Sequence, residues 1–116
     1  MYMEKRIAKD LLKMGLVVRS DITLRPYSKT MNGYYDPNTD LIVVYVYDDR
    51  DNELYADYNM IFCTVLHEYV HSLQHRSSKW RRRKGVMHDV EFWVIYNNLV
   101  AQARKEGILY EYREAS

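Results

Sequence analysis

The segment VLHEYVHSLQH, residues 65–75, places three histidines and a glutamate in a largely apolar run. Within it, His67, Glu68 and His71 fit the pattern H-E-x-x-H. Residues four apart on a helix lie one above the other on the same face, so these two imidazoles can bind one zinc ion. Glu68 then sits beside a zinc-activated water and can take its proton as general base. The spacing therefore indicates metal-assisted hydrolysis.

A catalytic zinc site also needs a third protein ligand and an open fourth position. His88 follows a loop and begins the next predicted helix, so the chain can double back and bring a third imidazole to the other two. His75 is one alternative, but three histidines at i, i+4 and i+8 on one straight helix do not converge easily on one ion. An acidic ligand, Asp89 or Glu91, is the other alternative. We expect His88 to complete the site.

Several tyrosines are candidates for contacts with a substrate. The candidates for substrate binding are Tyr34, Tyr35 and Tyr96. Their hydroxyls, together with that of Tyr69, are also the candidates to donate a hydrogen bond to an oxyanion that develops during hydrolysis. The sequence does not choose among them. Cys63 lies one turn before the first histidine of the motif, and we interpret it as a packing thiol rather than as a ligand.

The N-terminal part of the chain predicts one helix and a short strand region. Residues 4–14 carry apolar side chains at near-helical spacing, and Gly15 follows as a C-terminal stop. The apolar side of this helix is formed by Ile7, Leu11, Leu12 and Met14. Residues 16–27 combine β-branched residues with polar interruptions and then a proline. They predict a short strand or two.

The middle of the chain predicts a β-hairpin. Residues 41–47 form a β-branched and aromatic run that is typical of a strand. Tyr34 and Tyr35 are expected on its hairpin partner. The segments 32–33 and 36–38, with sequences NG and DPN, have the residues that turns favour. We therefore expect a short antiparallel sheet.

Two further helices are predicted, with a loop at 76–87 between them. The first covers 53–75, contains the H-E-x-x-H motif, and has Asp51 or Asn52 as its predicted cap. Its apolar face is formed by Ile61, Val65, Leu66, Tyr69, Val70 and Leu73. The second covers 88–106, with one side formed by Phe92, Tyr96, Leu99, Val100 and Ala103. The order helix, small sheet, long helix, loop, helix predicts an α+β fold.

Length and composition limit the classes of protein to which the chain can belong. Its 116 residues are enough for one domain with a single core, so we expect one catalytic domain over residues 1–116. A net charge of +1 indicates no particular partner, and one cysteine excludes an internal disulfide framework. The N-terminus does not resemble a signal peptide, and no apolar segment approaches the ~18 residues that span a bilayer. We expect a cytoplasmic protein with no membrane contact; the oligomeric state stays open.

A basic segment lies in the loop between the predicted zinc ligands. The sequence KWRRRK, residues 79–84, places five positive charges around a tryptophan. Such a segment can contact phosphates while the ring stacks on a base. A solvated loop is the simpler interpretation, and selection of acidic substrates is a third. Nucleic acid is therefore only a weakly supported partner.

The motif HEYVH, a loop and then HDVEFW together resemble the SprT-like zinc metallopeptidases, a group of HExxH zincins. The strand-turn-strand sequence GYYDPNTDLIVV before the motif is similar to that family too, and the Phe-Trp pair is similar to the YgjP-like peptidases. The resemblance covers residues 32–93. It implies a small zincin-like domain in which Glu68 is the catalytic base and the ligands are His67, His71 and His88. Asp89 stands where many members have glycine, and the cysteine-rich zinc ribbon of some members is absent.

These observations lead to one expected function and two alternatives. The expected function is a zinc metallopeptidase, a hydrolase that cleaves peptide or protein substrates with Zn²⁺ as its cofactor. The first alternative is a non-catalytic, metal-containing binding module whose basic loop, residues 79–84, contacts nucleic acid or a protein partner. The second alternative is an inert structural domain in which the histidine spacing arose by chance.

Overall fold

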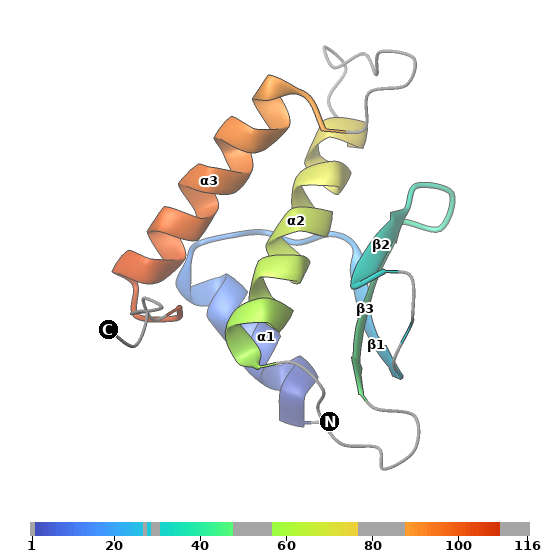
Figure 1. The fold of residues 1–116 in the computed structure, drawn as a ribbon, viewed down its shortest axis with the longest axis horizontal. Coiled ribbons are helices and arrows are strands. Elements are labelled where there is room, and N and C mark those ends of the chain that lie inside the picture. Colours follow the sequence, from blue (N-terminus) through green and yellow to red (C-terminus); the bar gives the residue numbers. More distant parts are fainter. Residues whose placement is uncertain (1, 27, 29–30, 48–56, 77–87, 110–116) are drawn as a thin grey trace.

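The fold is described for residues 2–26, 28, 31–47, 57–76 and 88–109 of a computed structural model. Helices and strands follow the predicted α+β order in this part of the chain (Figure 1). They are α1 (Tyr2–Lys13), β1 (Asp21–Pro26), β2 (Gly33–Asp36), β3 (Leu41–Tyr47), α2 (Tyr58–Arg76) and α3 (Val90–Lys105).

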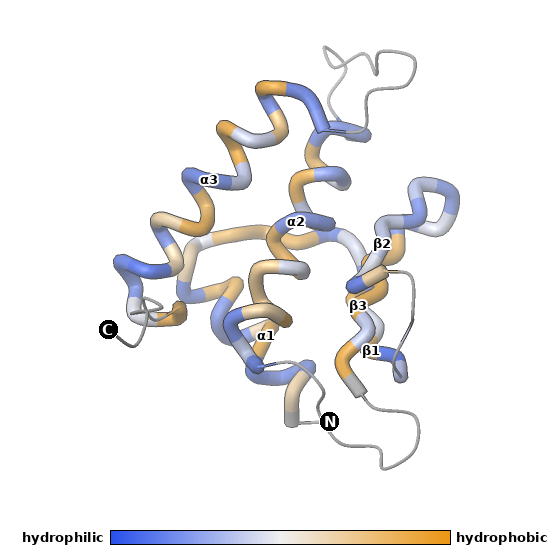
Figure 2. Tube along the Cα trace, in the orientation of Figure 1, coloured by the Kyte–Doolittle hydropathy of each residue, from blue (hydrophilic) through white to orange (hydrophobic). Residues whose placement is uncertain are grey.

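Helix α2 lies in the middle of the molecule, with the sheet on one side and α3 on the other (Figure 1). It contacts both β2 and β3 as well as α3, whereas α1 contacts β1. The colouring in Figure 2 alternates between polar and apolar residues along α1 and α3, as expected for helices with one buried side. The H-E-x-x-H motif therefore lies on the central element of the fold.

The sheet is mixed rather than antiparallel. Its strand order is β1-β3-β2, with β2 antiparallel and β1 parallel to β3. The predicted hairpin is confirmed, and its turn contains a hydrogen bond from the backbone N–H of Asn38 to Asp36 Oδ1 at 2.9 Å. The expectation of a wholly antiparallel sheet is wrong, because β1 pairs with the edge of β3 that the hairpin leaves open. Strand β2 is consequently an edge strand, next to α2.

The core lies between the sheet and the helices. Alternate residues of β3 are buried against the helices: Ile42, Val44 and Val46. The predicted apolar face of α2 is confirmed, since five of its six residues are buried and the sixth, Leu73, packs against the core. On α1, Ile7 and Leu11 are buried, but Leu12 is 75 % exposed, contrary to its predicted place. Neighbouring helix residues point about 100° apart, so Leu11 and Leu12 cannot both face the core.

Capping residues set the starts of α2 and α3. Asp57 Oδ1 accepts a hydrogen bond from the Met60 N–H at 2.9 Å, so α2 begins at Tyr58, and residues 53–56 of the predicted helix lie outside the described part of the chain. Asp89 caps α3 in the same way. His88 therefore precedes the final helix instead of beginning it. Asp51 and Asn52, the predicted caps of this helix region before α2, lie outside the described residues.

The end of α3 follows the predicted stop. Gly107 adopts φ 76°, a left-handed conformation that suits glycine after a helix. Ile108 and Leu109 then return to the core, where both are buried. The basic segment 79–84 is outside the described part of the chain. No helix in that described part is long and apolar enough to cross a membrane.

Candidate metal centre

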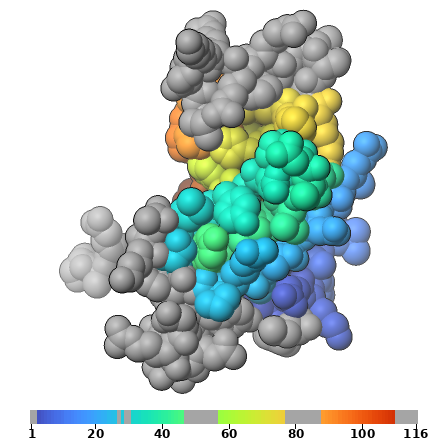
Figure 3. All heavy atoms as spheres, turned by 90° about the vertical axis from the view of Figure 1, so that its right-hand side faces the viewer, coloured from blue at the N-terminus to red at the C-terminus, as the bar shows by residue number. Residues whose placement is uncertain are grey.

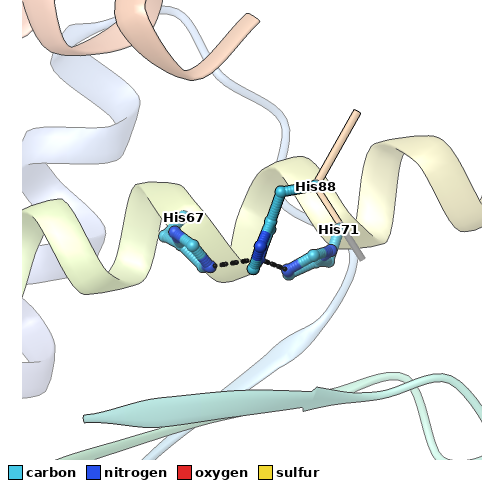
Figure 4. A group of neighbouring side chains, drawn as sticks. All are labelled: His67, His71 and His88. Atoms are coloured by element: carbon cyan, nitrogen blue, oxygen red, sulfur yellow. Dashed lines mark hydrogen bonds between the residues drawn. The ribbon is translucent and has the colours of Figure 1, made fainter. Parts of the chain in front are cut away.

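Three imidazoles converge at one point between α2 and the start of α3 (Figure 4). His88 Nε2 lies 3.1 Å from His67 Nε2 and 3.1 Å from His71 Nε2. All three candidate ligand atoms lie within 4.8 Å of one another. No other His, Cys, Asp or Glu of the described residues belongs to this group. The three residues that the sequence selected as ligands are thus brought together.

The spacing of these nitrogen atoms suits a metal ion. Two ligands of a tetrahedral zinc ion, bound at about 2.0–2.1 Å, lie roughly 3.3 Å apart. A single imidazole nitrogen carries either one proton or one lone pair, so His88 Nε2 makes one good hydrogen bond and not two. A cation between the rings satisfies all three lone pairs at once. Imidazole donors suit zinc, copper, nickel or iron better than they suit magnesium or calcium.

The ring of His67 is kept in the form that binds metal. Burial, and after it the proximity of His88, lowers the pKa of His67 to about 4. That ring is therefore neutral at pH 7 with a lone pair available. Phe92 is fully buried, and its ring centroid lies 4.7–4.8 Å from the centroids of all three histidines. An apolar ring thus closes one side of the group.

Asp89 positions His88 and is not a ligand. Its Oδ1 accepts a hydrogen bond from the Phe92 N–H at 2.7 Å, which caps α3. The same oxygen accepts a second hydrogen bond from Gln74 Nε2 at 3.1 Å, and Gln74 belongs to α2. The residue next to His88 is in this way attached to the helix that carries the other two histidines.

Glu68 is the acidic group of the site. Its side chain is buried, and Oε2 lies 4.0 Å from His67 Nε2. Burial raises the pKa of Glu68 to about 7. A carboxyl group with such a pKa can both accept and return a proton near neutral pH. Glu68 is therefore beside the three histidines but outside the ligand group, as the motif predicts.

Two cavities adjoin the site, and both are bordered by Gly33, His67 and Glu68. The first has a volume of about 400 Å³; its other lining residues are Asn32, Met60, Cys63, Thr64 and Tyr96. The second has a volume of about 430 Å³; its other lining residues are Met31, Tyr34, Tyr35, Pro37, His71, Gln74, His75 and His88. A cleft thus extends to both sides of Glu68.

The candidate tyrosines differ in what their hydroxyls contact. The Tyr35 hydroxyl donates to Asp40 Oδ1 at 2.7 Å, and Tyr69 is buried in the core. The Tyr34 ring lies 6.3 Å from the ring of Tyr45 on the neighbouring strand. Tyr96 borders the first cavity beside Glu68 and hydrogen-bonds to Cys63. Tyr96 thus shares the first cavity with Glu68, whereas Tyr34 and Tyr35 share the second cavity with it.

The remaining sequence candidates lie outside the group of three histidines. His75 is exposed, and its ring centroid is 6.0 Å from that of Tyr35. Burial raises the pKa of the Cys63 thiol, which agrees with a packing role. Glu91 is exposed in the first turn of α3. The described structure therefore favours His88 over each of the alternatives.

Two features of the site were not anticipated. A Cβ atom on Gly33 would lie 2.5 Å from the Val43 carbonyl oxygen and 3.0 Å from Thr64 Cγ2. The glycine thus lets β2 approach α2 beside the site, although its sequence context suggested only a turn. A polar cluster also joins Arg76, at the end of α2, to Asp40 and Ser20. These residues are far apart in the sequence and form no motif.

No family model, curated protein or solved structure matches this chain.

Proposed function

We propose that the chain is a zinc-dependent metallopeptidase in which His67, His71 and His88 hold the ion and Glu68 is the general base. The observation that carries this proposal is the convergence of three Nε2 atoms, from two separate segments, beside one buried carboxyl group. The likeness of both histidine motifs to SprT-like metallopeptidases supports the same proposal.

The chemistry follows from the roles of these side chains. A zinc ion held by the three imidazoles would supply Lewis acidity toward a water molecule and a peptide carbonyl. Glu68 removes a proton from the water molecule while the water oxygen attacks the carbonyl carbon. When the C–N bond breaks, Glu68 returns that proton to the leaving amine. The carboxyl group ends each cycle as it began, so no further acid or base is needed.

The open edge of β2 supports a peptide as the substrate. The Tyr45 N–H donates to the Asn32 carbonyl at 2.9 Å, and Gly33 pairs with Val44. This pattern makes Gly33 and Tyr35 non-hydrogen-bonded positions, whose N–H and C=O groups point away from β3. No described strand pairs with that side of β2. An extended peptide can therefore add to this edge and lie across the three histidines.

The decisive experiment compares two glutamate variants, Glu68→Gln and Glu91→Gln. Zinc content is measured by elemental analysis of tag-free protein, and hydrolysis is measured on an unstructured protein such as casein. Glu68→Gln should keep one zinc per chain and lose at least about 100-fold in rate, because the general base is gone. Glu91→Gln, an exposed carboxylate outside the site, should keep both zinc and rate. Equal cleavage by wild type and Glu68→Gln overturns the assignment.

The binding-module alternative depends on residues 79–84, which lie outside the described part of the chain. It stays a prediction, and the same preparations test it. Salt-dependent binding to DNA by zinc-loaded protein that cleaves no substrate would favour it over the peptidase.

A further inference from the structure

The two cavities beside Glu68 meet at Gly33, the first residue of β2, and only the second continues along the strand. The starting end of the strand, Gly33, is held against Thr64 of α2, which lines the first cavity. Further along the strand, the ring of Tyr35 lies 6.0 Å from that of His75, and both line the second cavity. Strand β2 therefore runs away from the first cavity and along the second, in the same direction as α2 (Figure 1). In Figure 3 the residues of β2 and β3, in cyan and green, lie on the face of the molecule that is turned to the viewer.

This direction orients a peptide bound at the edge of β2. An antiparallel partner exchanges both backbone hydrogen bonds with a single residue of the edge strand and pairs slightly more stably than a parallel one. Gly33 can make such an exchange directly beside Glu68, because it borders both cavities. The N-terminal half of the peptide then lies along the second cavity. Its C-terminal half lies along the first.

The described lining of the first cavity carries no charged side chain other than Glu68. Cys63 and Tyr96 hydrogen-bond to each other, and both are uncharged groups. The Thr64 hydroxyl likewise donates to the Met60 carbonyl at 2.9 Å, which leaves its methyl group at the strand. An acidic side chain placed here finds no oppositely charged group in this described lining, and a basic one finds only the carboxyl group that the reaction uses.

The second cavity has a different lining. Met31, Tyr34, Tyr35 and Pro37 give it aliphatic and aromatic side chains, and α2 adds Gln74 and His75. The two cavities therefore offer different surroundings to side chains on the two sides of a peptide bond held at Glu68.

We infer that the first cavity binds an uncharged side chain on the C-terminal side of the cleaved bond, and that the second binds an apolar or aromatic one on the N-terminal side. This inference rests on the proposed function and deepens it, since it names the substrate as an internal segment of an extended chain. Thr64, Cys63 and Met60 are thereby specificity-determining residues.

Two methionines allow a matched test of both the cavities and the direction. Met60 borders the first cavity and is 50 % exposed; Met31 borders the second and is 44 % exposed. Because both side chains reach solvent, Met60→Lys and Met31→Lys are compatible with folding. Zinc-loaded wild type and both variants digest a denatured whole-proteome peptide mixture. Mass spectrometry then identifies the residues on each side of every cut.

Met60→Lys should enrich Asp and Glu in the two positions C-terminal to the cut by roughly two- to five-fold, the range of an exposed ion pair. Met31→Lys should give the same enrichment on the N-terminal side. Both effects should fall in 0.5 M salt, because screening weakens exposed pairs. Wild type should cut before charged residues less often than their abundance predicts.

Other outcomes separate this inference from the proposed function. Enrichment on the opposite sides overturns the antiparallel direction. Cleavage by both variants with the wild-type preference overturns the cavity assignment and leaves the peptidase standing. If zinc-loaded wild type cuts nothing, the proposed function fails and the inference fails with it.

Discussion

At the scale of single residues, the chemistry of the site depends on the burial of two ionisable side chains. Glu68 is buried next to His67, and burial moves their pKa values in opposite directions, to about 7 and about 4. The carboxyl group is thus ready to carry a proton while the ring stays neutral to bind a cation. Desolvation is the largest cause of both pKa shifts.

Gly33 gives a prediction at this scale. In Gly33→Ala the new Cβ meets the Val43 carbonyl at 2.5 Å, so backbone must move, and we expect the free energy of unfolding to fall by about 1–3 kcal/mol. Urea unfolding measures the change. Combining it with Thr64→Ser removes the second close contact, that with Cγ2, but not the first. The double variant should therefore recover only part of the loss, and full recovery would contradict this explanation.

At the scale of elements, two polar junctions attach neighbouring segments to α2. Near the site, Asp89 joins the start of α3 to Gln74. Two residues further along, at the last residue of α2, Arg76 binds Asp40, which also accepts hydrogen bonds from Ser20 and Tyr35. The first junction sets where His88 lies, and the second holds the β2–β3 turn against the helix.

The first junction predicts a loss of metal affinity from a residue that does not bind metal. Asp89→Ala removes the cap of α3 and the contact with Gln74, so His88 is held less firmly. We expect zinc affinity, measured by competition with a chromogenic chelator, to fall about 10-fold, and helix stability to fall by about 1 kcal/mol. Glu91→Ala, two residues further along, is the control and should change neither. Unchanged affinity in Asp89→Ala would show that His88 is positioned by other contacts.

The second junction predicts a pH dependence of stability. Hydrogen bonds from Tyr35 and then Ser20, together with Arg76, lower the pKa of Asp40 below its usual value near 3.8. A lowered pKa in the folded state means that the ionised group stabilises the fold above that value. This stabilisation is lost as the pH falls through the lowered pKa.

Asp40→Asn tests this dependence, because asparagine also tolerates the φ of 54° at this position. Urea unfolding is measured from pH 7 to pH 2. The variant should be less stable than wild type at pH 7, and the difference should shrink as the pH falls below the usual carboxyl pKa near 3.8 and through the lowered pKa of the folded state. A constant difference across this range would assign the effect to packing rather than to charge.

At the scale of the whole molecule, spacing and turn residues in the sequence predicted the features that lie within a single helix or hairpin. The four-residue spacing of His67 and His71 needed only helix geometry, and the hairpin followed from its turn residues. Strand direction did not follow, because a run of apolar residues has the same pattern in parallel and antiparallel pairing. The contact between Gly33 and Thr64 also depends on which elements pack together. The spacing of residues in the sequence does not show which elements pack together.

If the three imidazoles hold an ion, the position of His88 links that ion to the stability of the fold. The site joins α2 to the segment before α3, so zinc bound only by the folded state stabilises it by RT ln(1 + [Zn]/Kd), about 4 kcal/mol at a thousand-fold excess over Kd. Thermal unfolding followed by circular dichroism should therefore show a midpoint that rises with added zinc and falls with EDTA. His88→Ala should abolish most of this dependence, whereas His75→Ala, outside the group, should keep it. If the two variants respond to zinc alike, His88 is not the third ligand, and the convergence of imidazoles has no role in holding an ion.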